Sequence, residues 1–410
     1  MKKILKYIGI IAIVIIVFNL IFNSYFRMRK NDGYVLFGYS GLYKYFNKEH
    51  KKLIYWKEFY QYDLMGTDKE YLLYGNDKKR IISVDKKNVI SDKWVENINE
   101  INIISANSNK EFKVSILDNN NVDLSYYNTT ENIFAVSDIE GDFDRFIKIL
   151  QKSHVINNSL QWNYGKGHLV LLGDFFDRGN DVTAVLWLCY QLEQEAEKQG
   201  GKVHFILGNH EQMNLRGNMK YIDRKYKALS QKLNIPYKEL YGKNSELGRW
   251  IRSKNAIEII NNMFFVHGGI SPDFIKRKES VDKINQNIRL TLDTNTSDYY
   301  TEEGKAKNNP LLPYIEMDSP LWYRGYFQDW GDYKKATQSE VDAVCKYYEV
   351  NKIIVGHTIV EKIKTHYNGK VIGIDITSYS EEDKNKPSAL LIENNNFYAV
   401  DELGRKFPIK

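Results

Sequence analysis

Five short stretches of the sequence carry side chains that can bind metal ions. In chain order they read SDIEGDFD at 137–144, GDFFDRGND at 173–181, GNHEQ at 208–212, VHGG at 266–269 and GHT at 356–358. Carboxylate and imidazole groups are common metal ligands, and three of the eight histidines lie in these stretches. A single stretch of this kind is usually an ordinary turn, but five in one region indicate a metal site.

These stretches need a scaffold that brings them together, and the residues before them predict one. Each stretch follows an apolar run typical of a buried strand, and helical periodicity lies between the runs, as at 142–156 and 181–198. Apolar strands alternating with helices predict an α/β fold in which the carboxyl ends of the strands meet at one edge. We therefore expect all five stretches to lie at that edge.

The same motifs resemble those of a known family. GDFFDRG, GNHE, HGG and GHT occur in the order found in the calcineurin-like metallophosphoesterases, whose protein-phosphatase branch has the pattern GDxHG, GDxxDRG, GNHE, HGG, GH. NSELGRWIRSKN before FVHGGISP, and SPLWYRGY after it, are most similar to the bacterial Shewanella-like phosphatases. The resemblance covers about residues 132–380. It implies an α/β/β/α sandwich of two mixed sheets and a site that uses two divalent metal ions.

The resemblance also implies which residues hold the metals. Asp138 would bind the first ion and Asp174 would bridge both ions. The second ion would be completed by Asn209, His267 and His357. Two metals in such a site lower the pKa of water and neutralise charge on a phosphoryl group.

Other residues of the motifs would act on the substrate. His210 would protonate the leaving oxygen, and Asp177 would orient that histidine. Arg178 would bind the substrate phosphate, because a planar guanidinium suits two oxygens at once. Arg324 is a second candidate for this role, and Arg252 is a third.

Plainer structural roles remain open for three of these residues. Asp177 and Arg178 could form an ion pair that caps the following helix. Arg324 could stack on Trp322 or Tyr326 without meeting substrate.

The sequence departs from the family pattern at Glu140, where the family has histidine. A strand that ends at Asp138 presents residue 140 toward the same side, so Glu140 can still reach the first metal. An all-oxygen first site would favour Mn²⁺ or Mg²⁺ over Zn²⁺ or iron. The alternative is a first site that is weak or vacant.

These residues suggest three functions. The first is a metal-dependent phosphoesterase that hydrolyses phosphomonoesters with a metal-activated hydroxide, acting on a phosphoprotein or on a small phosphate ester. The second is a hydrolase of dinucleoside polyphosphates or other phosphodiesters on the same fold. The third is a non-catalytic, membrane-anchored binding protein with a degenerate metal site.

Charge and cysteine content argue against several other classes of protein. Residues 1–30 hold six of the 58 basic residues and no acid, which leaves 52 basic and 52 acidic residues in the remainder. A neutral body argues against a nucleic-acid partner. Two cysteines without a CxxC motif argue against a disulfide framework or a cysteine-bound metal.

The first thirty residues predict a membrane anchor. Residues 7–26 are uncharged and rich in Ile and Val, and about twenty such residues suffice to cross a bilayer as a helix. The stretch lacks the small-residue cleavage site of a signal peptide, which is the alternative. Positive charge flanks both ends, with a slight excess before the stretch that favours a catalytic domain outside the cytoplasm.

We therefore predict three domains. Residues 1–30 form the anchor, and residues 31–130 form a small antiparallel β domain of unknown role, because short alternating runs are broken by GND, DKKN and DNNN. Residues 131–410 form the metallophosphoesterase domain. Within it, 214–260 predicts a helical insertion and 293–310 a polar loop.

Overall fold

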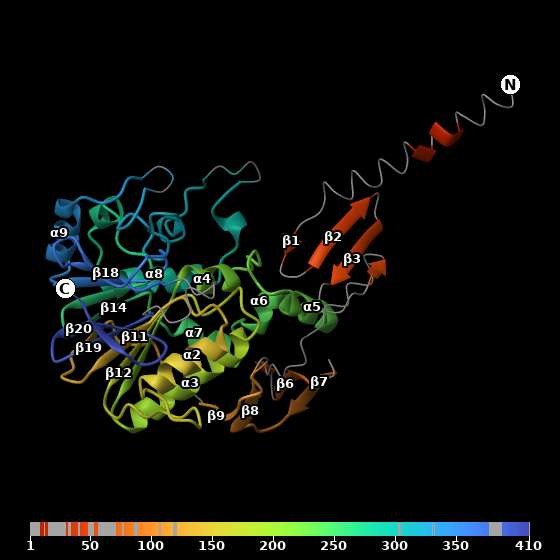
Figure 1. Cartoon of the computed structure of the whole chain (residues 1–410), viewed down its shortest axis with the longest axis horizontal. Helices are drawn as coiled ribbons and strands as arrows, with labels where there is room; N and C mark the ends of the chain where they lie inside the picture. Colours follow the sequence, from red (N-terminus) through yellow and green to blue (C-terminus); the bar gives the residue numbers. More distant parts are fainter. Residues whose placement is uncertain are drawn as a thin grey trace. The chain divides into compact units, whose positions relative to one another are not determined.

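The computed structural model describes most of the chain (Figure 1). It covers residues 71–409 except 76–77, 86–88, 106–107, 118–120, 302–303, 305, 330, 332 and 377–387. Before residue 71 it describes helical positions 9–11 and 13–14 and the backbone of four strands. The chain divides into two compact units, Met1–Asp63 and Leu64–Lys410.

The first unit contains a four-stranded antiparallel sheet in the order β1-β2-β3-β4. Its strands are β1 (Lys30–Asn31), β2 (Tyr34–Tyr39), β3 (Leu42–Asn47) and β4 (Leu53–Tyr55). Across the described residues, no helix has the length and apolar character needed to span a bilayer. Most of the predicted anchor, 7–26, lies outside the described residues.

The second unit is built on two six-stranded mixed sheets, as the resemblance implies. The first has the order β13-β12-β11-β19-β20-β21, with β11 to β13 parallel and the others antiparallel. Its strands are β11 (Ile133–Val136), β12 (His168–Leu172), β13 (Lys202–Ile206), β19 (Ala389–Glu393), β20 (Asn396–Val400) and β21 (Lys406–Pro408).

The second sheet has the order β10-β14-β15-β16-β18-β17, and the pairs β15–β16 and β16–β18 are parallel. Its strands are β10 (Tyr126–Tyr127), β14 (Ile257–Ile260), β15 (Met263–Val266), β16 (Lys352–Val355), β17 (Thr365–His366) and β18 (Val371–Gly373).

The two sheets pack face to face over one hydrophobic core. Both sheets supply fully buried side chains to it, among them Ala135, Val170, Ile206, Phe265, Ile354 and Ile372. Burial on both faces explains why these strands are nearly continuous apolar runs in the sequence.

Helices cover the sandwich, and local sequence determines where they begin. The Asp142 side chain accepts a hydrogen bond from the Arg145 amide and caps α2 (Phe143–Lys152), which buries Phe146 and Leu150. The adjacent α3 (Val182–Lys198) is buried along most of its length and ends before Gly200, which has a positive φ of 77°. Both helices lie on the same side of the first sheet (Figure 1). On the second sheet, α8 (Val281–Thr291) packs against β14, and α9 (Gln338–Tyr347) precedes β16.

The segment predicted as a helical insertion, 214–260, contains three complete helices. They are α5 (Arg224–Leu233), α6 (Tyr237–Leu240) and α7 (Glu246–Arg252), and the segment starts at the end of α4 (Asn209–Leu215). Its last residues form β14 instead, because they pair with β15 inside the second sheet.

Five further strands before residue 116 belong to the second unit. They are β5 (Tyr71–Tyr74), β6 (Lys79–Val84), β7 (Ile90–Val95), β8 (Glu100–Ile104) and β9 (Glu111–Ser115), paired antiparallel within two small sheets. Of these strands, β5 packs on α7, and β8 and β9 pack on α3. Tyr71 accepts a hydrogen bond from the Thr183 hydroxyl (3.2 Å), and Tyr190 accepts one from the Leu117 amide (2.9 Å). The units thus divide between residues 63 and 64, whereas the sequence suggests a boundary near 130.

Candidate active site

All five motifs follow strands and meet at the carboxyl edge of the sandwich. The strands concerned are β11, β12, β13, β15 and β16. Six residues there adopt a left-handed backbone, which is uncommon outside glycine and concentrates at functional sites. They are Asp138, Glu140, Asp174, Asp177, Arg178 and His357.

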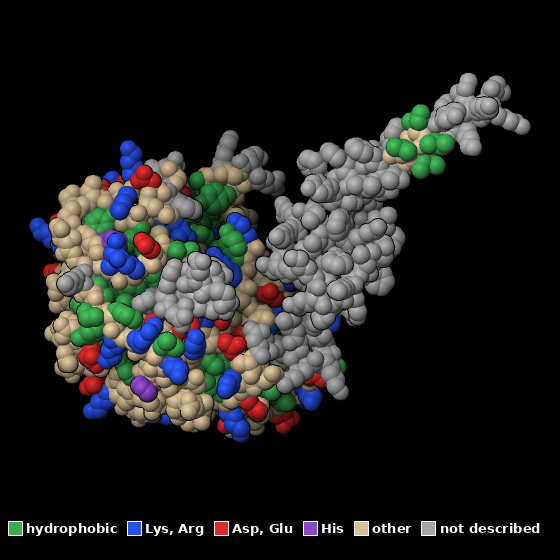
Figure 2. Space-filling model, in the orientation of Figure 1, with side chains coloured by type: hydrophobic (Ala, Val, Ile, Leu, Met, Phe, Trp, Pro, Cys, Tyr) green, Lys and Arg blue, Asp and Glu red, His purple; other side chains and the backbone are tan. Residues whose placement is uncertain are grey.

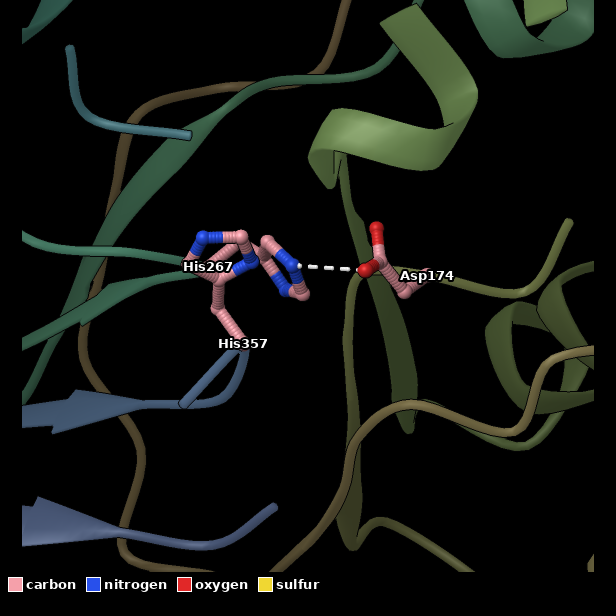
Figure 3. A group of neighbouring side chains, drawn as sticks. All are labelled: Asp174, His267 and His357. Carbon is pink, nitrogen blue, oxygen red and sulfur yellow. Dashed lines mark ion pairs between the residues drawn. The ribbon is translucent and has the colours of Figure 1, made fainter. Parts of the chain in front are cut away.

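Asp174 is the centre of the cluster. Its Oδ2 atom lies 3.0 Å from Nε2 of His267, and its Oδ1 accepts a hydrogen bond from the His210 amide (2.9 Å). Asp174, His267 and His357 present ligand atoms within 4.8 Å of one another, from the ends of three different strands (Figure 3). A second such group joins Asp174 to Glu140 and His210. Asp174 belongs to both groups, so its carboxylate is placed as a ligand shared between two metal ions would be.

Backbone carbonyls orient both histidines of the first group. The Nδ1 atom of His267 donates to the Leu172 carbonyl (2.8 Å), and Nε2 of His357 donates to the Trp322 carbonyl (2.9 Å). Each imidazole is thereby left with one nitrogen available as a ligand, which is the usual arrangement around protein-bound metals. This donor set fits divalent metal ions.

The charges of the cluster also favour a cation. Burial alone would raise the pKa of the Asp174 carboxyl, but His210 and His267 outweigh it and lower that pKa. Burial alone would lower the pKa of His267, but Asp174 and Asp138 raise it to about 10. For Asp138 burial dominates, and the pKa is raised. The cluster thus contains more buried carboxylates than positively charged partners, and a bound cation would stabilise their negative charge.

Asp138 and Asn209 lie against the same cluster. The Asp138 carboxylate accepts hydrogen bonds from the Ser137 hydroxyl (2.5 Å) and the His357 amide (3.1 Å). The Asn209 side-chain oxygen lies 3.0 Å from Nε2 of His267.

His210 and Asp177 form the expected acid–base pair. The Nδ1 atom of His210 lies 2.5 Å from Oδ2 of Asp177, and its Nε2 lies 3.7 Å from Oδ2 of Asp174. Burial alone would lower the pKa of His210, but the Asp174 and Asp177 carboxylates raise it to about 9. A protonated imidazole held this way can donate a proton through Nε2.

Glu140 contacts a substrate-binding candidate as well as the cluster. Its carboxylate lies 2.7 Å from Nη1 of Arg178, and its amide donates to the Asp174 carbonyl (2.9 Å). The Arg178 side chain is 41% exposed, so it is accessible to a substrate while bound to Glu140.

The other two arginines differ in position. Arg324 donates through Nη1 to the His357 carbonyl (2.5 Å), which places it beside the cluster. Arg252 bonds to Asp293 and to the carbonyls of Tyr241 and Gly248, none of which is a predicted site residue. The structure therefore brings Arg324, but not Arg252, into contact with the site.

Sequence reasoning missed three residues near the cluster. Asp375 is buried just after β18, and its pKa is raised by burial and by Asp138. An apolar run before it, VIGI, is the same signal that marked the other strand ends. Trp322 and Tyr221 contact His357 and His210. No local pattern in the sequence would have identified them.

The fold and the cluster fit one class of protein: a hydrolase that binds divalent metal ions at the strand ends of a two-sheet α/β sandwich. The family model for calcineurin-like phosphoesterase matches residues 131–361, so the chain belongs to that family. It is therefore a metallophosphoesterase, a hydrolase of phosphoester bonds from a family that binds divalent metal ions.

Individual relatives point to one branch of the family. The chain is 28% identical to Shewanella-like protein phosphatase 1 of Plasmodium berghei over 301 residues, covering 70% of this chain and 81% of that protein. It is 23% identical to Shewanella-like protein phosphatase 2 of Arabidopsis thaliana, covering 60% of this chain and 71% of that protein. The chain is also similar to the crystal structure of a cold-active protein-tyrosine phosphatase from a psychrophilic Shewanella. The two are 32% identical in sequence with a TM-score of 0.73, and the match covers 84% of this chain and 99% of that one. The resemblance to the Shewanella-like branch is confirmed.

Proposed function

We propose that this chain is a metal-dependent protein phosphatase that removes phosphate from a phosphorylated side chain. The observation that carries the proposal is the joint arrangement of the Asp174-centred cluster and the His210–Asp177 pair. Similarity to proteins named as protein phosphatases, over most of their length, supports a phosphoprotein substrate.

The residues divide the reaction between them. Two divalent metal ions, held by the cluster, would supply a hydroxide nucleophile and neutralise charge on the phosphate. Arg178 and Arg324 bind the phosphate oxygens on the exposed side. His210 donates its Nε2 proton to the leaving oxygen, and Asp177 holds the opposite nitrogen so that the ring cannot turn away.

The test is turnover of the full-length protein on a panel of matched substrates. Phosphopeptides should be hydrolysed after incubation with Mn²⁺, and an Asp174→Asn variant should lose activity because it loses the shared ligand. A preference for dinucleoside polyphosphates or phosphodiesters over every phosphopeptide would overturn the protein-phosphatase assignment. Absence of turnover on all of them would favour the binding-protein alternative.

We also propose that Glu140 is a ligand of the first metal and that the site prefers Mn²⁺. Glu140 lies with Asp174 and His210 in one group of potential ligands, and carboxylate oxygens suit hard cations. Metal analysis of protein dialysed against Mn²⁺ should find two ions per chain, and about one in Glu140→Gln. Two ions in the variant would overturn the role of Glu140. A stronger affinity for Zn²⁺ with unchanged stoichiometry would overturn only the metal preference.

We further propose that residues 7–26 anchor the protein in a membrane, with the catalytic unit outside the cytoplasm. The described part of this stretch is helical, and its apolar side chains Ile10, Ile11, Ile13 and Val14 are exposed (green in Figure 2). Alkaline extraction should leave the full-length protein with the membranes and release a chain beginning at residue 31. Release of both would overturn the anchor. Protection from protease added outside intact cells would overturn the orientation.

A further inference from the structure

Tyr221 lies on the loop between α4 and α5, beside the catalytic residues. Its carbonyl accepts a hydrogen bond from the Arg178 amide (3.0 Å), which ties this loop to the phosphate-binding motif. The side chain is 38% exposed, although most large aromatic side chains nearby are buried. An exposed ring on a loop tied to the site is available to a substrate.

The ring of Tyr221 lies close to the proposed proton donor for the leaving group and to the arginine proposed to bind the phosphate. Its centroid is 5.3 Å from the centroid of the His210 imidazole, with the planes tilted by 40°. The Arg178 guanidinium carbon is 5.9 Å from the same centroid. Tyr221 therefore borders the space between the proton donor and the phosphate clamp.

The chemistry determines what must occupy that space. The hydroxide oxygen bonds to phosphorus while the bond from phosphorus to the leaving oxygen breaks, and His210 gives its Nε2 proton to that oxygen. The products are inorganic phosphate and an alcohol or phenol. Because His210 must reach the leaving oxygen, the group attached to that oxygen lies on the His210 side, where Tyr221 is exposed.

We propose that Tyr221 forms the wall of the leaving-group subsite and makes the enzyme favour aryl over alkyl phosphate esters. This inference rests on the proposed function. An aromatic leaving group can stack on or meet the edge of the tyrosine ring, and such ring pairs contribute beyond simple burial of area. A serine or threonine leaving group offers no ring for this contact.

Two neighbours of Tyr221 are compatible with this role. Lys220 Nζ lies 4.7 Å from the ring centroid, but Lys220 is exposed and a substrate ring can displace it. Met219 is 43% exposed on the same loop and adds a flexible apolar contact. A competing role for Tyr221 is to hold Arg178 in place, which would affect all substrates equally.

The experiment compares the full-length protein with Tyr221→Ala and Tyr221→Phe on matched substrates. The substrates are one peptide sequence phosphorylated on tyrosine or on serine, and phenyl phosphate as an aryl ester without peptide. Tyr347→Ala is the matched control, because Tyr347 is similarly exposed (40%) on α9. Each value of kcat/KM is divided by that of the unaltered chain, so intrinsic differences in substrate reactivity cancel.

Tyr221→Ala should lower kcat/KM about five- to tenfold for both aryl substrates, the size expected of an aromatic pair, and less than about twofold for phosphoserine. Tyr221→Phe should keep the wild-type preference, and Tyr347→Ala should change nothing. A loss on the phosphotyrosine peptide alone would overturn the leaving-group role, because phenyl phosphate carries the same ring. An equal loss on all substrates, or no loss, would also overturn it while the proposed phosphatase function stands. Failure of the unaltered chain to hydrolyse any of them overturns both.

Discussion

The His210 imidazole is held between two carboxylates, and this explains how a buried histidine can act as an acid. Its Nδ1 atom contacts Asp177, and its Nε2 points toward Asp174. These neighbours raise its pKa to about 9 against the effect of burial, so the proton stays on the ring at neutral pH. The two carboxylates therefore keep a proton on His210, as its proposed role of general acid requires.

Replacing His210 with asparagine should lower kcat about 10²- to 10⁴-fold on phosphoserine or phosphotyrosine peptides, as is typical for loss of a general acid. The loss should be much smaller on p-nitrophenyl phosphate, because its leaving group is a weak base and needs no proton. Steady-state kinetics on both substrates measure this difference. Equal losses on the two substrates, or a loss of bound metal, would show that His210 is a ligand instead.

At the scale of elements, one buried glutamate joins the turns after β12 and β13, which carry two of the site motifs. Glu211, in the first turn of α4, accepts hydrogen bonds from the amides of Gly208 and Asp174 at its Oε2 and from those of Phe175 and Phe176 at its Oε1. These four amides belong to the turns after β12 and β13. The carboxylate thus fixes the spacing between Asp174 and the start of the α4 helix.

Glu211→Gln should destabilise the fold, because the amide NH₂ cannot accept the two bonds that one carboxylate oxygen accepts. A loss of about 2–3 kcal/mol is expected for bonds to a charged, buried group. Thermal unfolding should show a lower Tm, while the matched control Glu361→Gln, an exposed site, should match the unaltered chain. A wild-type Tm for Glu211→Gln would contradict the structural role.

The sequence predicted this arrangement of elements better than it predicted the side-chain contacts. Apolar runs and their polar ends placed Asp174, His267 and His357 at one edge. Each apolar run predicts a strand, and the polar stretch after it marks the carboxyl end of that strand. The pairing of Glu140 with Arg178 could not be read in the same way. This ion pair depends on left-handed turns at both residues, and the two turns become neighbours only when β11 and β12 pair. The bond between the His357 amide and Asp138 spans 219 positions.

At the scale of the whole molecule, a chain of three buried polar side chains links the two sheets. His168, the first residue of β12, bonds to His204 on β13 (2.8 Å), and His204 bonds to Glu258 on β14 (2.6 Å). Burial lowers the pKa of His204 to about 3 and raises that of Glu258, so this pair is a neutral hydrogen bond. The pKa of His168 is lowered to about 4 by burial and by the neighbouring His204 and Lys202.

His168 should make the protein less stable in acid. Its pKa is lower in the folded chain than the unfolded value near 6.5, so the unfolded state takes up the proton first as pH falls toward 4. Between pH 7 and 5 the free energy of unfolding should therefore fall by about 2 kcal/mol more in the unaltered chain than in His168→Gln. Urea titrations at the two pH values measure this difference. An identical fall in both proteins would contradict the shifted pKa.

The family match and the compact unit do not begin at the same residue. The match begins at 131, whereas the compact unit begins at Leu64 and includes β5 to β9, whose inward side chains Tyr71, Ile82, Ile103 and Val114 are buried. The stretch that the family model matches is thus shorter than the stretch that folds. A fragment 131–410 would expose the apolar flank of α3 and should aggregate on expression, whereas 64–410 should unfold cooperatively and retain turnover. Residues 64–130 are then best regarded as an outer wall that the catalytic core needs in order to stay folded.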